Sequence, residues 1–462
     1  MLKSAGLVFI SQVVMMVVLF LRNILIARLI SVEDFGLAVN LSIAVAFIEN
    51  ASYIGMQRMI VQDRDGESRH FQAALHMLQV IRGVLGGLAA LALAIPYAHF
   101  IGVPEVGWAF AVLALLPLLR GFQHLDFARF ERNMQFGATV TITWASPILS
   151  LVVALLVYFI SADYQMMLWA IVAQQIAQCV LSHLLAERRF ELAWDMAIMR
   201  RALAFGIPLL ANGLLLFALT NGDRLIITNQ FGLEVLGWFS AAFMLVQAVA
   251  TLVKRTFSSV VLPKLSAQAD NRAIQAATLQ MGLFLGIGLG LGMMFIGPAL
   301  LLTAFDMRYA PALEVLAILA LIQSVLMFKG TIATVAMSMA DTLNAVYGNL
   351  PRLVSFPIAF WAAQSGYDLI AVLLIGLVGE LFGTGLSLAL LKRQRGVPLR
   401  SLALPTGLAL AVGGLALWDS LQNPPSPEMF VAWNLNHVGL FILSCCFVVS
   451  LRELLNIVLR RR

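Results

Sequence analysis

The chain has 462 residues, of which 61% are hydrophobic and only 12% are charged. This composition excludes a soluble globular protein and predicts a membrane protein with many apolar helices. The formal net charge of +6 is not gathered into a basic block typical of nucleic-acid binding, so Lys and Arg are expected to report membrane topology instead.

Fourteen apolar segments are long enough to cross a bilayer, whose hydrocarbon core of about 30 Å needs roughly 20 helical residues. Each is expected to be a helix, because backbone groups in lipid must be satisfied internally and the alternating polarity of a barrel strand is absent. The first follows Lys3 without a small-residue cleavage site, so it is interpreted as a retained span. In chain order the segments cover approximately residues 4–28, 36–58, 73–98, 105–123, 139–160, 165–186, 203–228, 234–255, 276–303, 311–332, 346–364, 369–391, 402–419 and 430–451.

Lys and Arg gather in alternate connections between these segments. If the N-terminus is cytoplasmic, the inner connections hold most of them, for example Arg120 and Arg129, and the tail ends in three arginines, 460–462. The outer connections are almost free of Lys and Arg, apart from Arg308. The positive-inside rule then predicts an even number of spans with both termini in the cytoplasm.

Enzymatic features are not visible between the segments. No connection is long enough for a soluble catalytic domain, and no GxxxxGK[ST] motif for ATP is present. The three cysteines and six histidines lack metal-ligand spacing. We therefore expect a protein that is not an enzyme and that has no metal ion or cofactor.

One stretch of the chain occurs twice, as an internal sequence repeat. RNILIARLISVEDFG, which ends at Gly36, returns as DRLIITNQFGLEVLG, which ends at Gly237, and the same alignment superposes Glu33 on Glu234. The copies lie six helices apart, so equivalent helices would cross the membrane in the same direction. Such parallel repeats are related by an axis along the membrane normal.

The fold expected from these observations is an all-α polytopic membrane protein of about fourteen transmembrane helices. Two six-helix lobes would be related by a pseudo-twofold axis. We predict the N-terminal lobe at residues 1–200 and the C-terminal lobe at 201–395. An appended helix pair and a cytoplasmic tail would follow at 396–462.

Three arginines lie inside predicted spans, where an ionisable side chain is costly unless it faces a cavity or a partner. They are Arg22, Arg82 and Arg224, and the first and last hold equivalent places in the repeat once one residue is added. Guanidinium donates paired hydrogen bonds to phosphate and stays charged when desolvated, so these residues are candidates for binding a diphosphate or another anion. Alternatively, they reach the lipid headgroups or pair with a carboxylate.

Two carboxylates fall near the middle of predicted spans. Glu49 and Glu380 could bind a coupling proton or cation, or each could only neutralise a nearby arginine.

Four asparagines are predicted at depth in the membrane. Their amides could hydrogen-bond a glycan or join neighbouring helices. They are Asn23, Asn50, Asn212 and Asn221.

The segments RNILIARLISVEDFGLAVN, AFGIPLLANGLL and DRLIITNQFGLEVLGWFSAAF resemble the polysaccharide-biosynthesis transporters. These are the Wzx-type flippases for lipid-linked oligosaccharides in the multidrug/oligosaccharidyl-lipid/polysaccharide exporter superfamily. The resemblance runs through nearly the whole chain and implies alternating access, driven by an ion gradient or the membrane potential. It also implies arginines near a lipid diphosphate, at positions that match Arg22 and Arg224.

We therefore predict a flippase that moves an undecaprenyl-diphosphate-linked repeat unit of an exopolysaccharide or lipopolysaccharide across a bacterial inner membrane. Its partners would be the glycolipid, membrane lipids and a polysaccharide polymerase with its assembly proteins, and not nucleic acid. A multidrug or cation exporter of the same fold is one alternative, although its cavity would be acidic and aromatic. A lipid II flippase is another. A membrane-embedded polymerase or acyltransferase would need a nucleophile or base and usually a sizeable outer loop, and neither is visible.

Overall fold

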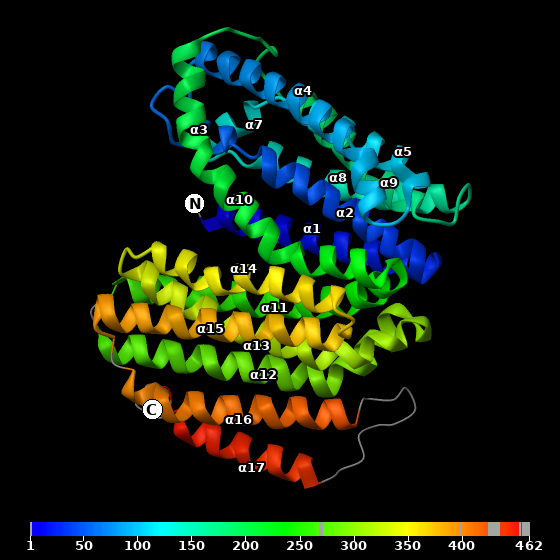
Figure 1. Cartoon of the computed structure of the whole chain (residues 1–462). Helices are drawn as coiled ribbons and strands as arrows, with labels where there is room; N and C mark the ends of the chain where they lie inside the picture. The colour runs from blue at the N-terminus through cyan, green and yellow to red at the C-terminus, as the bar shows by residue number, and fades with distance from the viewer. Residues whose placement is uncertain (1, 268–270, 398, 424–434, 452–453, 455–462) are drawn as a thin grey trace. The chain divides into compact units, whose positions relative to one another are not determined.

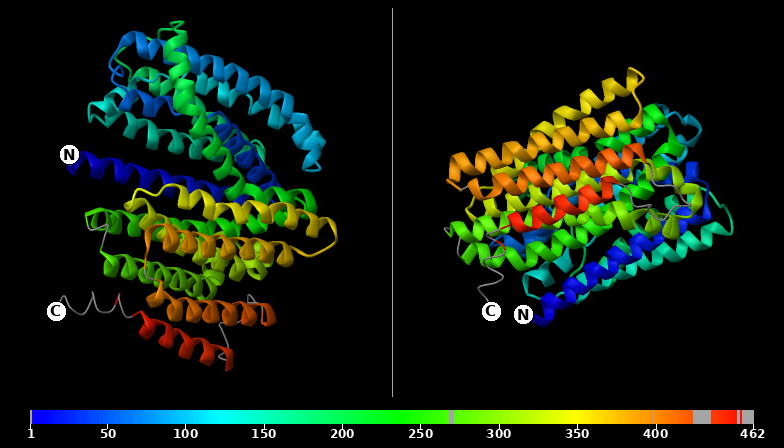
Figure 2. Two further views of the ribbon diagram at one scale, coloured as in Figure 1. Left: turned by 60° about the vertical axis from the view of Figure 1, so that its left-hand side comes forward. Right: turned by 90° about the horizontal axis from the view of Figure 1, so that it is seen from below.

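The computed structural model describes residues 2–267, 271–397, 399–423, 435–451 and 454 (Figures 1 and 2). In this part of the chain every regular element is a helix, which confirms the predicted all-α fold. The predicted tail arginines at 460–462 and much of the connection after Asp419 lie outside the described residues.

The chain forms two compact units, Met1–Gly237 and Trp238–Arg462, called here the N-terminal and the C-terminal unit. The helices of the N-terminal unit are α1 (Leu2–Leu29), α2 (Val32–Ser52), α3 (Met56–Gln62), α4 (Arg69–Phe100), η1 (Pro104–Val106), α5 (Gly107–Val112), α6 (Leu115–Gly121), α7 (Asp126–Arg132), α8 (Gly137–Tyr158), α9 (Gln165–Leu184) and α10 (Met196–Phe231). Helix α11 (Leu233–Ala267) begins in this unit and continues into the next. The C-terminal unit further contains α12 (Arg272–Phe305), η2 (Met307–Ala312), α13 (Leu313–Ser338), α14 (Leu343–Gln364), α15 (Leu369–Arg395), α16 (Arg400–Gln422) and α17 (Leu435–Ser450).

Each predicted span overlaps one or more of these helices. The span predicted at 36–58 covers most of α2, a break at residues 53–55 and the start of α3, and residues 430–434 of the last predicted span lie outside the described residues. Among the described residues, twelve helical segments are long and apolar enough to cross a membrane. The other two predicted spans form α14, which is less apolar, and α17, whose described apolar part is shorter. Only 22% of the apolar stretch of α1 and 28% of that of α8 is buried, so large apolar surfaces face outward. Such surfaces are stable in lipid, and the protein is a multi-pass membrane protein.

Helix α10 belongs to the N-terminal unit, where it packs on α2, α3 and α4. The compact units therefore divide the chain one helix later than the lobe boundary expected at residue 200. The assignment of six helices to each lobe stays a prediction, as does the side of the membrane on which the termini lie.

Small side chains bring the helices of the N-terminal unit together. Ala90, Ala94 and Ala98 recur every four residues and form one buried face of α4. This spacing places them on one side of the helix, where α5 and α6 pack closely. Helix α1 packs on α8, and α8 on α9.

The two copies of the repeated stretch touch one another. A Cβ atom added to Gly36 would collide with the carbonyl oxygen of Leu233, and one added to Gly237 would collide with that of Val32. In the alignment of the two copies Val32 is equivalent to Leu233 and Gly36 to Gly237, so the same contact is made twice with the copies exchanged, as a local two-fold relationship demands. Between α10 and α11 the chain turns at Gly232, whose φ of 91° lies in a region that favours glycine. The repeat therefore supplies a reciprocal glycine contact at the starts of α2 and α11.

Helix α13 is the most buried of the apolar helices, with 78% of its apolar stretch covered. It packs on α12, α15 and α16, and a Cβ at Gly286 of α12 would lie 2.7 Å from the carbonyl oxygen of Ser324. Helices α16 and α17 lie side by side at the C-terminal end (Figure 1). A charged residue buried on α13, such as Lys329, must therefore find its partners inside the protein.

Candidate functional site

A polar cavity of about 530 Å³ lies inside the N-terminal unit. Helices α1 to α4 and α6 to α9 all contribute to its wall, which carries two arginines, two glutamates and several amides. The polar lining residues are Glu49, Asn50, Tyr53, Gln57, Gln79, Arg82, Arg120, Gln123, Glu131, Thr139, Thr143 and Gln178. In a chain this apolar, such a concentration of polar groups is the best candidate for a binding site.

A close helix crossing positions the two arginines of the cavity. Gly83 of α4 faces Gly121 of α6, and a Cβ at Gly83 would lie 2.7 Å from the Cα atom of Gly121. Arg82 and Arg120 immediately precede these glycines and both line the cavity. The absence of side chains at the crossing therefore brings two guanidinium groups near one another.

Gln79 fixes the end of α6. Its Nε2 donates to the carbonyl oxygens of Arg120 at 2.8 Å and Gln123 at 2.7 Å, and to that of Gly121 at 3.4 Å. These carbonyl groups at the helix end lack partners within the helix, so the amide acts as a cap. One glutamine of α4 thus holds the backbone that carries Arg120.

Each cavity arginine has its own partners. Arg120 is ion-paired with Glu49 of α2, and its Nε donates to Oε1 of Gln175 at 3.1 Å. Arg82 donates to the carbonyl oxygen of Ser52 at 2.9 Å. Among the described residues Arg82 forms no ion pair, so of the two cavity arginines only Arg120 is paired with a carboxylate.

Arg22 lies apart from this group, between α1, α8 and α9. Its guanidinium donates to Ser150 at 2.7 Å and Gln174 at 3.1 Å, and more weakly to Asn23 at 3.4 Å. The residue is 7% exposed, and all three acceptors are neutral. Within the described part of the chain no carboxylate pairs with it. Its charge is therefore stabilised by hydrogen bonds to neutral side chains but is not neutralised.

The other predicted polar residues of this unit are scattered. Arg224 lies on α10, which packs on α2, whereas Arg22 lies on α1, which packs on α8. Asn50 lines the cavity and donates to the carbonyl oxygen of Ala46, but Asn221 is buried and bonded within α10. Asn212 is exposed.

The C-terminal unit contains a second group of buried charges. Glu380 of α15 is ion-paired with Lys329 of α13, and its Oε1 lies 3.6 Å from Nε of Arg352 on α14. Lys254 of α11 donates to Oε1 of Gln323 at 3.2 Å. Glu380 is thus shared by two cations.

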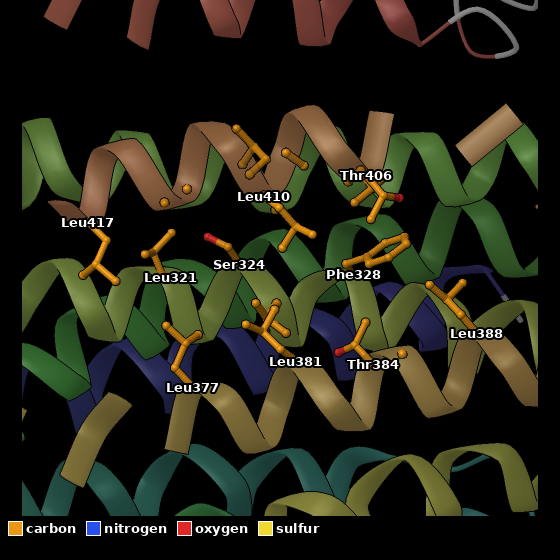
Figure 3. Close-up of a pocket in the computed structure, with 18 residues that line it drawn as sticks. Leu321, Ser324, Phe328, Leu377, Leu381, Thr384, Leu388, Thr406, Leu410 and Leu417 are labelled. Atoms are coloured by element: carbon orange, nitrogen blue, oxygen red, sulfur yellow. The ribbon is translucent and has the colours of Figure 1, made fainter. Parts of the chain in front are cut away.

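This unit also holds an apolar cavity of about 440 Å³ among α12, α13, α15 and α16 (Figure 3). Ser324 and Thr384 point hydroxyl groups near it, but these donate to the carbonyl oxygens of Ala320 and Glu380 in their own helices. The cavity therefore offers an apolar ligand much surface and a sugar few free groups.

Outside the spans, a buried carboxylate ties two connections together. Asp126 accepts hydrogen bonds from Arg129 at 2.6 Å and from the backbone N–H groups of Glu187 and Arg188. Burial opposes the charge of this carboxylate, but the hydrogen bonds outweigh it and hold the pKa of Asp126 at about 2. Arg129, counted from the sequence as a topological charge, is thus also structural.

The residues described in the structure contain no group of three or more His, Cys, Asp or Glu side chains that could hold a metal ion.

The sequence of this chain matches a known protein family. The family described as "Polysaccharide biosynthesis protein" matches residues 25–281, which is more than half of the sequence. The chain belongs to this family. The resemblance predicted from the repeated stretch is thereby confirmed.

Solved transporters share the fold of this polysaccharide biosynthesis protein. One is titled as the inward-facing conformation of a multidrug resistance MATE family transporter of the MOP superfamily; its TM-score is 0.66 at 11% identity, over 82% of this chain and 94% of that one. Another is the lipid II flippase MurJ in an inward closed conformation, with a TM-score of 0.61 at 15% identity, over 100% and 99% of the two chains. No curated protein gave a significant match to the sequence. At these identities the likeness concerns the fold alone.

Four buried or cavity-lining cations of this family member were not singled out from the sequence. The sequence predicts Arg120 in a connection because it ends an apolar run, yet it lies in the last turn of α6. A usable signal was present, since both cavity arginines occur as an Arg-Gly pair inside an apolar segment. The other three, which belong to the C-terminal unit, are Lys254, Lys329 and Arg352.

Proposed function

We propose that this protein is a flippase that moves an undecaprenyl-diphosphate-linked oligosaccharide across the bacterial inner membrane by alternating access. An ion gradient would supply the energy. The proposal rests on membership of the polysaccharide biosynthesis family and on a fold shared with transporters. The observation that carries it is the pair Arg82 and Arg120 in one polar cavity.

The chemistry of the cavity suits the head of such a glycolipid. Two guanidinium groups that line one cavity can each donate paired hydrogen bonds to phosphate oxygens. The amides that surround them, such as Asn50, Gln57 and Gln178, are groups that hydrogen-bond sugar hydroxyls.

We assign different roles to the predicted residues. Arg82 and Arg120 would contact the diphosphate. Arg22 is buried and has no carboxylate partner among the residues that the structure describes, so it would raise the positive potential along the path instead of touching substrate in this conformation. Arg224 stays a candidate for a later step, and Glu49 and Glu380 stay candidates for ion coupling.

Other functions fit this site less well. A multidrug exporter that takes cations would need a cavity in which acidic groups outnumber basic ones, whereas here Glu49 is already paired with Arg120. A lipid II flippase would use the same diphosphate chemistry and differs only in the glycan.

Reconstituted vesicles that contain a fluorescent undecaprenyl-diphosphate oligosaccharide test the proposal. Glycolipid that reaches the opposite leaflet would be detected with a membrane-impermeant glycosidase. Arg82→Ala and Arg120→Ala should each slow transport about 10- to 100-fold, because a hydrogen bond to a charged group contributes about 1.5–3 kcal/mol. Arg200→Ala is the matched control, since this arginine is exposed on α10.

The competing functions predict other results in the same vesicles. Faster transport of lipid II than of the oligosaccharide carrier would identify a lipid II flippase. Transport of a cationic dye without glycolipid transport would identify a multidrug exporter. Delivery of unpolymerised glycan by cells that lack the protein would contradict flipping altogether and favour a polymerase.

In cells we expect a multi-pass protein of the inner membrane with both termini in the cytoplasm. The cavity lies toward α3 and α7, next to connections predicted to be cytoplasmic. A substrate completed on the cytoplasmic side would therefore enter at this end. Polysaccharide polymerase and assembly proteins would act after it.

A further inference from the structure

Arg120 is held along one edge of its guanidinium group. Its Nε donates to Oε1 of Gln175 on α9 at 3.1 Å, and its Nη2 is paired with the carboxylate of Glu49 on α2. The N–H groups of Nε and Nη2 point to the same side of the planar fork, so these two partners occupy that side. Nη1 has no hydrogen bond among the described residues, and Arg120 lines the polar cavity. The edge formed by Nη1 and Nη2 therefore remains for a ligand.

Gln175 is buried and uses one end of its amide. The residue is 5% exposed, and its Oε1 accepts from Arg120. Its buried Nε2 has no hydrogen-bond partner among the residues that the structure describes. An unpaired buried donor costs about 1–3 kcal/mol, so a glutamine that only joined helices would be expected to use both ends. The oxygen that faces Arg120 is thus the part of this side chain that the site uses.

The glutamine lies behind the arginine as seen from the cavity. Among the described residues that form the cavity wall, Arg120 is present and Gln175 is not. In this conformation Gln175 can therefore act on a ligand only through Arg120. The backbone of Arg120 is held separately, because its carbonyl oxygen accepts from Gln79 at 2.8 Å. Two glutamines thus fix this arginine, one at its backbone and one at its side chain.

We propose that Gln175 is a positioning residue that directs the guanidinium of Arg120 into the polar cavity, where its free edge binds a phosphate group of the substrate's diphosphate. This inference rests on the proposed function and adds a residue that its anion site requires. The free edge carries two parallel N–H groups, which match two oxygens of one phosphate group. Without Gln175 the guanidinium loses its bond at Nε, and the anion must restrict its rotation on binding.

Calorimetric titration of the purified full-length protein in detergent with farnesyl diphosphate tests the inference. Gln175→Met keeps the size of the side chain without the amide oxygen and should weaken binding about two- to tenfold, the loss expected for one hydrogen bond. Gln175→Asn keeps an amide that is too short to reach Nε and should weaken binding to a similar extent. Gln165→Met is the matched control on α9, since its amide is bonded to Ser161 and Asp163 and its loss should leave the affinity unchanged.

A double-variant cycle shows whether Gln175 acts through Arg120. Arg120→Lys keeps the positive charge but replaces the planar fork with a point charge that has no edge to orient. In that background Gln175→Met should change the affinity by less than about twofold. The same full loss in both backgrounds would overturn the inference, because the amide would then act independently of the fork.

Thermal unfolding separates positioning from packing. A Gln175→Met protein that unfolds at a lower temperature but binds farnesyl diphosphate like wild type would overturn the inference. Farnesol has the same apolar chain without the diphosphate, and wild type and Gln175→Met should bind it alike. A loss of farnesol binding equal to that of farnesyl diphosphate would also count against positioning, because it would locate the effect in the apolar surface.

Vesicle transport distinguishes this inference from the proposed function. Glycolipid transport and anion binding that Gln175→Met both leaves unchanged would refute positioning but leave the flippase intact. Anion binding that depends on Gln175, in a protein that moves no glycolipid, would refute the flippase and leave positioning in place. Failure of the wild-type protein to bind farnesyl diphosphate would overturn the inference together with the assignment of the diphosphate to this cavity.

Discussion

The buried charges of the C-terminal unit allow a sharp prediction about stability. Glu380 forms ion pairs with both Lys329 and Arg352, whereas Lys329 is paired with Glu380. The two ends of the ion pair are therefore not equivalent. We expect Glu380→Gln to destabilise the protein more than Lys329→Met.

The magnitude follows from burial. The side chain of Glu380 is only 4% exposed and that of Lys329 is 11% exposed. Removing one member of a buried ion pair costs about 3–5 kcal/mol, because the remaining charge stays buried. Glu380→Gln deprives two cations of their shared carboxylate and should cost the upper part of that range. Lys329→Met leaves Glu380 with Arg352 at 3.6 Å and should cost about 2–3 kcal/mol.

Equilibrium unfolding in mixed detergent micelles, followed by tryptophan fluorescence, would measure these free energies. The double variant Lys329→Met, Glu380→Gln should cost less than the sum of the single changes, because the two residues are directly coupled. Glu314→Gln is the control, since this residue is exposed on the same helix as Lys329 and should change the free energy by less than about 0.5 kcal/mol. A larger loss for Lys329→Met than for Glu380→Gln, or strict additivity in the double variant, would refute the argument.

Three further predictions concern the N-terminal unit. Gly36→Ala and Gly237→Ala should each cost about 1–3 kcal/mol in the same unfolding assay, because a methyl group there collides with a backbone carbonyl, and a neutral result would contradict the close contact. Asp126→Asn should cost about 2–3 kcal/mol at pH 7, since the folded pKa of about 2 lies below the unfolded value of about 3.9. That contribution is fully present above about pH 4 and is lost as the pH falls toward 2, so melting curves of wild type and variant should converge in acid. Gln79→Leu removes the donor to the end of α6 and should cost about 1–3 kcal/mol and weaken anion binding, whereas unchanged binding would separate the cap from Arg120.

Much of the fold could be predicted because lipid leaves the chain few choices. Within the described residues all fourteen predicted spans overlap helices, since an apolar run of this length can satisfy its backbone only as a helix. The repeat at Gly36 and Gly237 was visible for a similar reason. A backbone contact with no room for a side chain requires glycine at both positions, and the sequence has glycine at both equivalent positions of the repeat.

The site could be predicted only in part. Arg82 was recognised because it interrupts an apolar segment, but its neighbour Arg120 looked like the charged edge of a span. Their proximity depends on the crossing of α4 and α6, which are separated along the chain by the two short helices η1 and α5. Glu380 likewise looked like an isolated carboxylate until folding brought Lys329 and Arg352 to it.

The sequence by itself determined the membrane character, the places of the apolar helices along the chain and the residue types available for binding an anion. These depend on composition and local spacing, because each helix satisfies its backbone and meets the lipid with its own residues. Only the tertiary structure decided which charges neutralise one another and which remain available in a cavity. That decision depends on distances of a few ångströms between helices far apart in the chain, and no local pattern contains them.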